Sequence, residues 1–471
     1  MDRDGGPGDA ALGFESLDGE VEVDSLDVEG NVPSWLEGSL YRNGPACFEA
    51  DGRSLEHWFD GYAMLHLFDF EDGDVAYANR YLDTDAYRSS RDDGMTYAEF
   101  ATDPCRDLFE RVFSFFLPPD PTDNANVNVT KVAEEYVAMT ETPLPVEFDP
   151  ESLETLGVAD YERHLDGHLT TAHPHHDGER GLTYNYVTEI GPRSTYRLSG
   201  VDDDGGSTEV GSRRVGRPSY MHSFGMTEDH LVLSEWPLVV DPLSLVLGNS
   251  PFVSSYRWKP ERGTWFTVFD KDSGEVVARC HDDRPAFAFH HVNAFERDGE
   301  FVVDVALYDD ASVIDELYLD RLRSEEGPEV DSRLARYTLD PGSNEASYEV
   351  VTDDVFELPR FDYARRAGVE YGFAYGVGRR GDGFLDALLK VDVESGDVDV
   401  WTEDGCYPGE PVFVERPGSS AEDDGVVLSV VLDSRERRSF LLVLDAESMD
   451  EVGRALAPHV VPHGFHGEYF E

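Results

Sequence analysis

The stretch Phe269–Ala278, FDKDSGEVVA, contains a pattern that recurs along the chain and decides the fold. An apolar strand runs into an acidic turn with Ser and Gly, and a second strand follows. Asp and Ser side chains hydrogen-bond to nearby backbone, and Gly supplies a positive φ, so the pattern predicts a hairpin turn. Comparable stretches are FDFEDGDVAYA from Phe68, FDPESLETL from Phe148, LDPGSNEASY from Leu339, VDVESGDVDV from Val391, LDAESMDEVG from Leu444 and a weaker copy, VDDDGGSTEV, from Val201.

The spacing of these seven turns predicts a repeat-built fold. Intervals of about 50 to 80 residues separate them, which fits four-stranded units of about 40 to 50 residues with insertions. We therefore expect an all-β fold, a seven-bladed β-propeller with a helical or loop dome over one face. Alternating stretches such as FVVDVALYD from Phe301 and VVLSVVLDS from Val426 also indicate strands. The alternative is that acidic hairpins are common in any β-rich protein of a salt-loaded cell.

The chain length leaves two organisations open, because 471 residues exceed the usual size of one domain. The repeats favour a single domain over residues 1–471, with residues 1–30 as an acidic N-terminal extension that is flexible at its start. The longer intervals imply inserted caps. The segment DPCRDLFERVFSFFLPP from Asp103 predicts a helix with a broad apolar face, and WPLVVDPLSLVLGNSPFV from Trp236 is apolar but too short to span a bilayer. Such caps either pack on the propeller or form a hydrophobic entrance with peripheral membrane contact.

The charge balance excludes some partners. The chain has 98 Asp and Glu against 38 Lys and Arg, a net charge of −60. Nucleic-acid binding is disfavoured on this ground. Strong salt screening makes such repulsion tolerable, so we expect a halophilic host; an acidic face for a basic partner would need clustered charge, and here the acids are spread along the chain.

The N-terminus, the distribution of apolar residues and the cysteines indicate the cellular compartment that we expect for the protein. The chain has no uncharged apolar run of about 18 residues and no signal-like N-terminus, so we expect a soluble, cytoplasmic protein that is at most peripheral to a membrane. Cys47, Cys105, Cys280 and Cys406 lie far apart with no CxxC pair. A zinc knot therefore has no support, and the cysteines are expected to be isolated, reduced thiols.

Four histidines follow the repeated turns at similar distances. They are His173, His222, His290 and His466, each about 17 to 21 residues beyond the turn before it. Equivalent offsets imply equivalent places, and the innermost strands of a propeller converge on its axis. Four imidazoles that meet there would bind a divalent transition metal, and a set without thiolate suits Fe(II) better than structural zinc.

Two turns are followed by glutamate instead. Glu357 comes 14 residues after position 343 of one turn, Glu410 comes 15 residues after position 395 of another, and Glu141 in MTETPLPV is a third candidate. A carboxylate near the axis can accept the second ring N–H of a liganding histidine and fix its orientation. The alternative for each is a solvated surface charge. Histidines that adjoin the proposed ligands and could be mistaken for them are His175, His176, His291 and His463.

A series of motifs extends over nearly the whole chain. They are GSLYRNGPACFE from Gly38, HWFDGYAMLHLFDF from His57, DNANVNV from Asp123, TAHPHHD from Thr171, PSYMHSFGMT from Pro218, FHHVNAFE from Phe289, FELPRFDY from Phe356, GEPVFV from Gly409 and PHGFHGEYF from Pro462. In this order they resemble the carotenoid cleavage oxygenases. TDPCRDLFERVFSFF resembles a segment of the branch that contains the metazoan β-carotene oxygenases and the retinal pigment epithelium isomerohydrolase. Cys105 falls where that branch has a proposed lipid-attachment site; we expect it to pack in the fold.

The resemblance implies a seven-bladed propeller with a helical dome and an axial Fe(II). By motif position its ligands would be His173 in AHP, His222 in MHSFG, the first His of HHVN, His290, and His466 in FHG. The supporting glutamates would be those of TET, FELP and GEP, which are Glu141, Glu357 and Glu410. No ligand is missing, so an active site is expected.

The resemblance also implies the chemistry. We expect an Fe(II)-dependent dioxygenase that uses O2 to cleave a C=C bond of a carotenoid to carbonyl products, with central cleavage of β-carotene at the 15,15' bond to retinal as the leading reaction. Alternatives are cleavage of an apocarotenoid or a stilbene-like compound, and isomerohydrolysis of retinyl esters. From another class, a non-catalytic propeller that binds a lipid or protein remains open, although the complete histidine set disfavours it.

Overall fold

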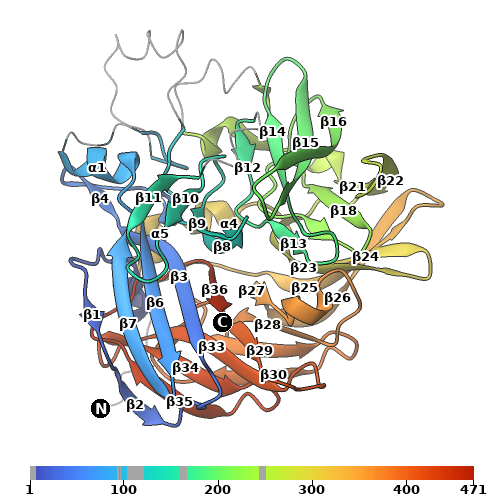
Figure 1. Ribbon diagram of the computed structural model, residues 1–471. Coiled ribbons are helices and arrows are strands. Elements are labelled where there is room, and N and C mark those ends of the chain that lie inside the picture. Colours follow the sequence, from blue (N-terminus) through green and yellow to red (C-terminus); the bar gives the residue numbers. More distant parts are fainter. Residues whose placement is uncertain (1–6, 93–94, 96, 103–120, 160–166, 243–250) are drawn as a thin grey trace.

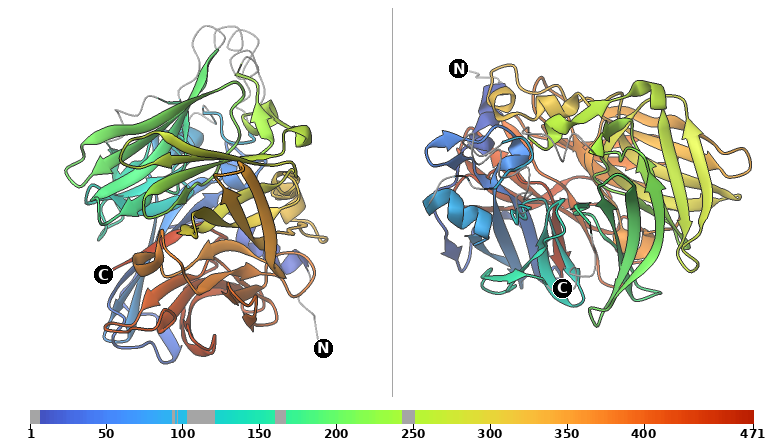
Figure 2. Two further views of the ribbon diagram at one scale, coloured as in Figure 1. Left: turned by 90° about the vertical axis from the view of Figure 1, so that its right-hand side faces the viewer. Right: turned by 90° about the horizontal axis from the view of Figure 1, so that it is seen from above.

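The computed structural model describes residues 7–92, 95, 97–102, 121–159, 167–242 and 251–471. Within this part of the chain the fold is all-β, and the larger sheets are arranged around a common centre like the blades of a propeller (Figure 1; Figure 2, right). The all-β propeller expected from the repeats is therefore confirmed. The helix expected from Asp103 lies outside the described residues.

Three sheets come mainly from the first half of the chain. The first has the order β1 (Glu22–Val23), β7 (Asp74–Tyr81), β6 (Tyr62–Glu71), β3 (Gly38–Cys47) and β36 (Gly467–Phe470). The second is β11 (Thr155–Val158), β10 (Val146–Phe148), β9 (Glu135–Met139) and β8 (Asn128–Val132). The third is β12 (Leu169–Thr170), β14 (Leu182–Glu189), β15 (Ser194–Asp202) and β16 (Ser207–Val215), with β13 (His175–Asp177) also paired to β14.

The remaining large sheets follow in chain order. One has eight strands in the order β17 (Gly225–Met226), β18 (His230–Glu235), β21 (Thr264–Asp270), β22 (Val276–Asp282), β26 (Glu345–Val355), β25 (Arg333–Asp340), β24 (Glu300–Tyr308) and β23 (Phe287–Arg297). The next is β27 (Glu357–Arg360), β28 (Phe373–Gly378), β29 (Ala387–Asp392) and β30 (Val398–Thr402). The last is β2 (Asp27–Gly30), β35 (Glu451–Leu456), β34 (Arg438–Asp445), β33 (Gly425–Asp433) and β31 (Cys406–Pro408), with β32 (Val412–Glu415) also paired to β33.

Smaller elements lie between the sheets. Two short ribbons pair β4 (Glu49–Ala50) with β5 (Arg53–Ser54), and β19 (Leu238–Val240) with β20 (Tyr256–Trp258). The described helices are α1 (Asp85–Asp92), α4 (Val313–Glu316), α5 (Leu319–Leu322) and α6 (Tyr363–Arg366), and the 3-10 turns are η1 (Pro7–Phe14), η2 (Trp58–Asp60), η4 (Val253–Ser255) and η5 (Pro260–Arg262). In the described residues, every helix falls short of the length and apolar character that a membrane crossing needs.

The quoted turns form the hairpins predicted from them. Each of the seven stretches joins two antiparallel strands, and Phe269–Ala278 joins β21 to β22. In that turn the Asp270 carboxylate accepts hydrogen bonds from both the backbone N–H and the hydroxyl of Ser273, at 2.7 Å each. Asp445 and Ser448 repeat the arrangement in the turn between β34 and β35. The local turn chemistry therefore fixes where each strand ends.

Both ends of the chain are built into the ring of sheets. β36, at the C-terminus, pairs with β3, and β2, near the N-terminus, pairs with β35 of the last sheet. Parts of the expected N-terminal extension pack on the ring, because its apolar residues Phe14 and Leu26 are buried in the core. Each end closes the ring by adding a strand to a sheet formed by the other end.

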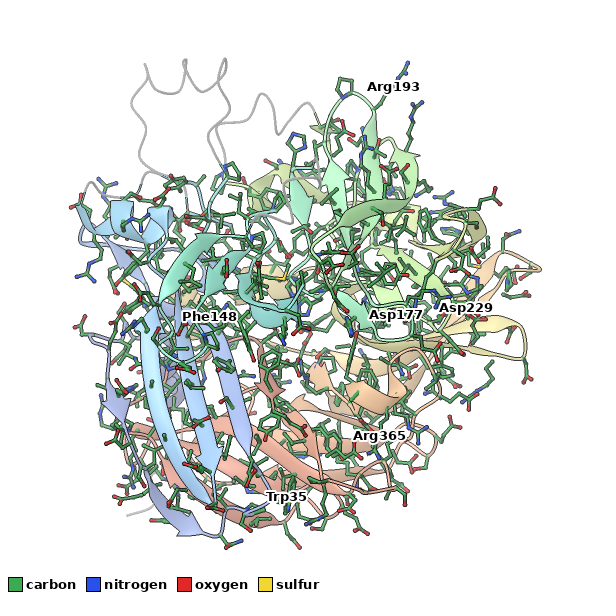
Figure 3. The ribbon with its side chains drawn as sticks, in the orientation of Figure 1. Trp35, Phe148, Asp177, Arg193, Asp229 and Arg365 are labelled. Atoms are coloured by element: carbon green, nitrogen blue, oxygen red, sulfur yellow. The ribbon has the colours of Figure 1, made fainter. Side chains whose placement is uncertain are left out.

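The sheets meet along their end strands and through ion pairs. β17 contacts β23, β23 contacts β27, and β36 contacts both β32 and β8, so these end strands surround the centre. Farther out, the buried Lys271 ammonium donates to Asp177 at 2.7 Å, and Arg180 links Asp177 to Asp229. Figure 3 labels both aspartates, Asp177 at the end of β13 and Asp229 in the turn between β17 and β18. These contacts fix one sheet against the next.

A substitution at Gly274 tests how closely the turn between β21 and β22 packs against β16. Gly274 has φ 68 and a Cβ there would lie 1.8 Å from the carbonyl oxygen of Val210 on β16. We predict that Gly274→Ala lowers the free energy of unfolding by about 2 to 4 kcal/mol, measured by urea denaturation. The matched control is Gly52→Ala, which has φ 71 but open space around the position, and which should cost about 1 kcal/mol. Equal losses in the two variants would contradict the close packing.

Candidate metal centre

Four histidines from distant parts of the chain meet at the centre of the ring. The ligand-capable nitrogens of His173, His222, His290 and His466 all lie within 4.8 Å of one another. The Nε2 atoms of His173 and His222 are 3.0 Å apart, and those of His290 and His466 are 3.2 Å apart. Three of these side chains are buried and His173 is half-buried. The structure thus brings together all four histidines proposed from the sequence.

The end strands of the sheets position these side chains. His290 lies on β23, while the other three precede short end strands: His173 before β13, His222 before β17, and His466 directly before β36. The Thr171 hydroxyl accepts the backbone N–H of His173 and donates to the carbonyl of His222, which couples two of the four backbones. Equivalent places in different sheets therefore converge, as the shared spacing after the turns predicts.

Each of three histidines donates to a glutamate. His222 Nδ1 lies 2.7 Å from Glu141, His290 Nδ1 lies 2.6 Å from Glu357, and His466 Nδ1 lies 2.7 Å from Glu410. An ionised carboxylate only accepts, so the proton of each neutral imidazole is on Nδ1, and Nε2 carries a bare lone pair that points to the centre. The three glutamates proposed from the sequence therefore lie where they set the tautomer of these histidines.

The protonation of the histidines suits metal binding. Burial lowers the pKa of His173 and His466 well below the usual value, and the neighbouring histidines lower it further. Burial also lowers the pKa of His222, although Glu141 opposes the shift. These imidazoles are therefore neutral at neutral pH, which is the form that binds a metal.

The donor set fits a divalent cation. The Nε2 lone pairs of His290 and His466 face each other at 3.2 Å, and neither can donate while its Nδ1 proton is held by glutamate. Two metal–nitrogen bonds of about 2.1 Å at right angles end about 3.0 Å apart, close to the spacing observed. A cation between the nitrogens would turn this repulsion into coordination. Nitrogen ligands without thiolate favour a transition metal such as iron, cobalt or zinc.

Further groups that the sequence analysis missed hold the glutamates. The hydroxyl of Tyr220 donates to Glu141 at 2.7 Å, and that of Tyr308 donates to Glu357 at 2.7 Å. Glu410, which is 1% exposed, instead pairs with the Arg42 guanidinium at 2.6 Å. Tyr220 stands two residues before His222, and this spacing in the sequence could have indicated it. Arg42 lies in the quoted GSLYRNGPACFE motif, but no spacing in the sequence points to it.

The neighbouring histidines have other partners. Both ring nitrogens of His175 are within 2.9 Å of Tyr363 and the Phe224 carbonyl, and both of His291 are 2.7 Å from Ser223 and Ser234. His463 lies 3.2 Å from the carbonyl of Ala10. His176 is exposed and contacts Thr183. The structure thus separates the converging histidine of each sequence pair from its neighbour.

Aromatic rings form a wall on one side of the histidines. The Phe289 ring centre lies 5.5 Å from that of His222 and 5.9 Å from that of Phe59, and Phe59 lies 5.2 Å from Phe465 and 5.1 Å from Phe100. We call Phe59, Phe100, Tyr220, Phe289 and Phe465 the aromatic wall. These rings pack against one another and form an apolar surface next to His222.

Comparisons with known proteins agree with this site. A family profile described as "Retinal pigment epithelial membrane protein" matches residues 14–471. The mitochondrial carotenoid-cleaving dioxygenase of Pongo abelii is 34% identical over 510 residues, which cover 94% of this chain and 91% of that protein. The β,β-carotene 15,15'-dioxygenase of Rattus norvegicus is 33% identical over 498 residues, covering 93% and 87%.

A solved structure extends the comparison to the fold. The cobalt-substituted apocarotenoid oxygenase of Synechocystis superposes with a TM-score of 0.88 at 26% identity, and the match covers 100% of both chains. The resemblance inferred from the motifs is thereby confirmed over the whole chain. The chain belongs to the retinal pigment epithelial membrane protein family, the family of the carotenoid cleavage oxygenases.

Proposed function

We propose that this protein is an Fe(II)-dependent dioxygenase that cleaves a C=C bond of a carotenoid with O2, and that its reaction is the 15,15' cleavage of β-carotene to retinal. The convergence of four imidazole nitrogens, three of them oriented by glutamates, carries this proposal. Relatives named carotenoid-cleaving dioxygenase and β,β-carotene 15,15'-dioxygenase support the substrate class.

Each part of the centre has a role in this proposal. His173, His222, His290 and His466 bind the iron, and bound Fe(II) supplies the centre at which O2 is activated for cleavage of the double bond. Glu141, Glu357 and Glu410 hold the imidazoles in the tautomer that binds metal, and their negative charge offsets the positive charge of the metal. The aromatic wall holds the rigid polyene against the centre and keeps water away from it.

The proposal extends to the architecture. We infer seven blades, because the eight-stranded sheet consists of two four-stranded antiparallel units joined by one parallel pair, His281 with Glu345. The segments around η2, α1 and β19 to β20 contribute to a dome over one face. The whole of residues 1–471 forms one oxygenase domain. The acidic composition fits a salt-rich cytoplasm, and the apolar cap segments fit peripheral contact with a membrane.

An apocarotenoid is the second candidate substrate. The match to the Synechocystis apocarotenoid oxygenase over the full length of both chains favours it. A shorter polyene would use the same histidines and the same wall. The two candidates differ in the length of the ligand and in the oxygen-bearing end group of the apocarotenoid.

The first test is the reaction itself. We predict that the iron-loaded protein converts β-carotene to retinal, and that mass spectrometry finds ¹⁸O from labelled O2 in the aldehyde. Incubation with an apocarotenal in parallel tests the second candidate. Retinol formed from a retinyl ester without label would instead indicate an isomerohydrolase, and recovery of every polyene unchanged would contradict a cleavage enzyme.

The second test concerns the ligands. We predict that His222→Ala binds less than one iron per chain by elemental analysis and has lost turnover, because one nitrogen of the centre is gone. The control His176→Ala removes an exposed histidine whose partner is Thr183, and it should bind iron as the natural sequence does. Full iron content in His222→Ala would overturn the assignment.

The third test concerns the glutamates. Glu357→Gln should keep the fold but lower the affinity for Fe(II) by about 10- to 100-fold, because an amide no longer enforces the Nδ1 proton on His290. Glu296→Gln is the matched control, since exposed Glu296 accepts a hydrogen bond from His230 at 2.8 Å, away from the centre. Equal affinities in the two variants, measured by competition with a metal chelator, would count against the role of Glu357.

A further inference from the structure

Two buried carboxyl groups lie behind the aromatic wall, outside the metal centre. Asp60 ends η2 and is 0% exposed, and Glu99 precedes Phe100 and is 4% exposed. Neither carboxyl has an ion pair with lysine or arginine within the described residues. Buried acids without a cationic partner are costly, so a role for this pair needs a physical explanation.

Asp60 binds the backbone of the segment that carries Phe100. Its carboxylate accepts the backbone N–H of Ala101 at 2.8 Å, the hydroxyl of Thr102 at 2.6 Å and the backbone N–H of His57 at 2.9 Å. One carboxylate therefore ties residues 101–102 to the start of η2. Three donors of this kind stabilise the ionised form of Asp60.

Glu99 binds the other side of the same segment. Its carboxyl accepts the hydroxyl of Thr122 at 3.0 Å and lies 3.5 Å from the Asn124 amide, which in turn donates to the carbonyl of Gly61 at 3.1 Å. The two acids thus hold residues 99–102 between η2 and the segment that leads into β8. Phe100 is the large side chain within this short stretch.

Phe100 connects the clamp to the metal centre. Its ring lies 5.1 Å from Phe59 and 6.1 Å from Tyr220, whose hydroxyl donates to Glu141 beside His222. Its carbonyl accepts the backbone N–H of Val253 at 3.0 Å, which fixes a second cap segment. A shift of residues 99–102 would therefore move part of the aromatic wall.

We propose that Asp60 and Glu99 are positioning residues that form a clamp on the segment of Phe100. The clamp holds Phe100 in the aromatic wall while Glu99 is protonated, and it releases Phe100 when both carboxyls are ionised. This inference rests on the proposed function, since the wall is assigned there to the polyene.

The charged and titratable groups around Asp60 and Glu99 determine the pH at which the clamp releases residues 99–102. Among the described residues, the titratable groups that face the pair include Asp123, Tyr62, Tyr318 and His57, and burial keeps His57 neutral by lowering its pKa to about 4. Burial and then the charge of Asp60 raise the pKa of Glu99 to about 8, and burial raises the pKa of Asp60 to about 6. The folded state therefore favours protonated Glu99, and the clamp is intact at low pH and is lost as the pH rises through about 8.

The test measures polyene binding without turnover. Iron-loaded protein is titrated anaerobically with an apocarotenal between about pH 6.5 and about pH 9.5, and tryptophan fluorescence quenching gives Kd. We expect Kd to rise at least about fivefold through a midpoint near pH 8 in the natural sequence, and to stay constant in Glu99→Gln, which is neutral at every pH. The control Glu151→Gln changes an exposed turn residue and should follow the natural sequence.

A second measurement does not depend on the substrate. Hydrogen exchange of the peptide that contains residues 97–102, compared between the natural sequence and Glu99→Gln at each pH, should show extra exchange above pH 8 in the natural sequence alone. Absence of this difference, or an identical pH dependence of Kd in the two proteins, overturns the clamp. If the exchange difference is present but no polyene binds at any pH, the proposed function and the positioning role are both contradicted. The pH-dependent contact between Asp60 and Glu99 would still stand.

Discussion

Two imidazole nitrogens with bare lone pairs repel each other at 3.2 Å unless a cation lies between them, and the rest of the structure depends on this contact. The Glu357 and Glu410 carboxylates hold the protons of His290 and His466 on the opposite nitrogens, so neither ring can relieve the repulsion by hydrogen bonding. The arrangement is stable as part of a metal site and costly without the metal. The fold therefore holds the histidine nitrogens in an arrangement that a divalent cation would stabilise.

The ring of sheets makes that geometry possible. His290 stands on β23, His466 stands directly before β36, and His173 and His222 stand shortly before β13 and β17. The strands β17, β23 and β36 contact other end strands around the centre, so sheet packing contributes to the distances between the histidines. His466 directly precedes β36, the strand that pairs with β3 to close the ring. Closure of the fold and completion of the histidine set are thus one structural event. The pair of Arg42 on β3 with Glu410 reinforces this closure from within.

The sequence predicted what local chemistry and repeated spacing determine. The hairpin turns depend on Asp, Ser and Gly within a few residues, and the shared offsets after them indicated which histidines converge. The contacts that could not be predicted join residues far apart in sequence: Arg42 and Glu410 are separated by 368 positions, and Tyr308 and Glu357 by 49. The burial of Phe14 and the clamp of Asp60 and Glu99 likewise arise from packing between segments. Such pairs become visible only when the sheets are assembled.

X-ray absorption at the iron edge of the Fe(II)-loaded protein tests the central claim most directly, because it reports the atoms bound to the metal in solution. We predict a first shell of light atoms with the outer-shell scattering of about four imidazole rings, and a loss of about one ring in His222→Ala. A sulfur scatterer, or a first shell with imidazole scattering from only one or two rings, would contradict a centre built from His173, His222, His290 and His466.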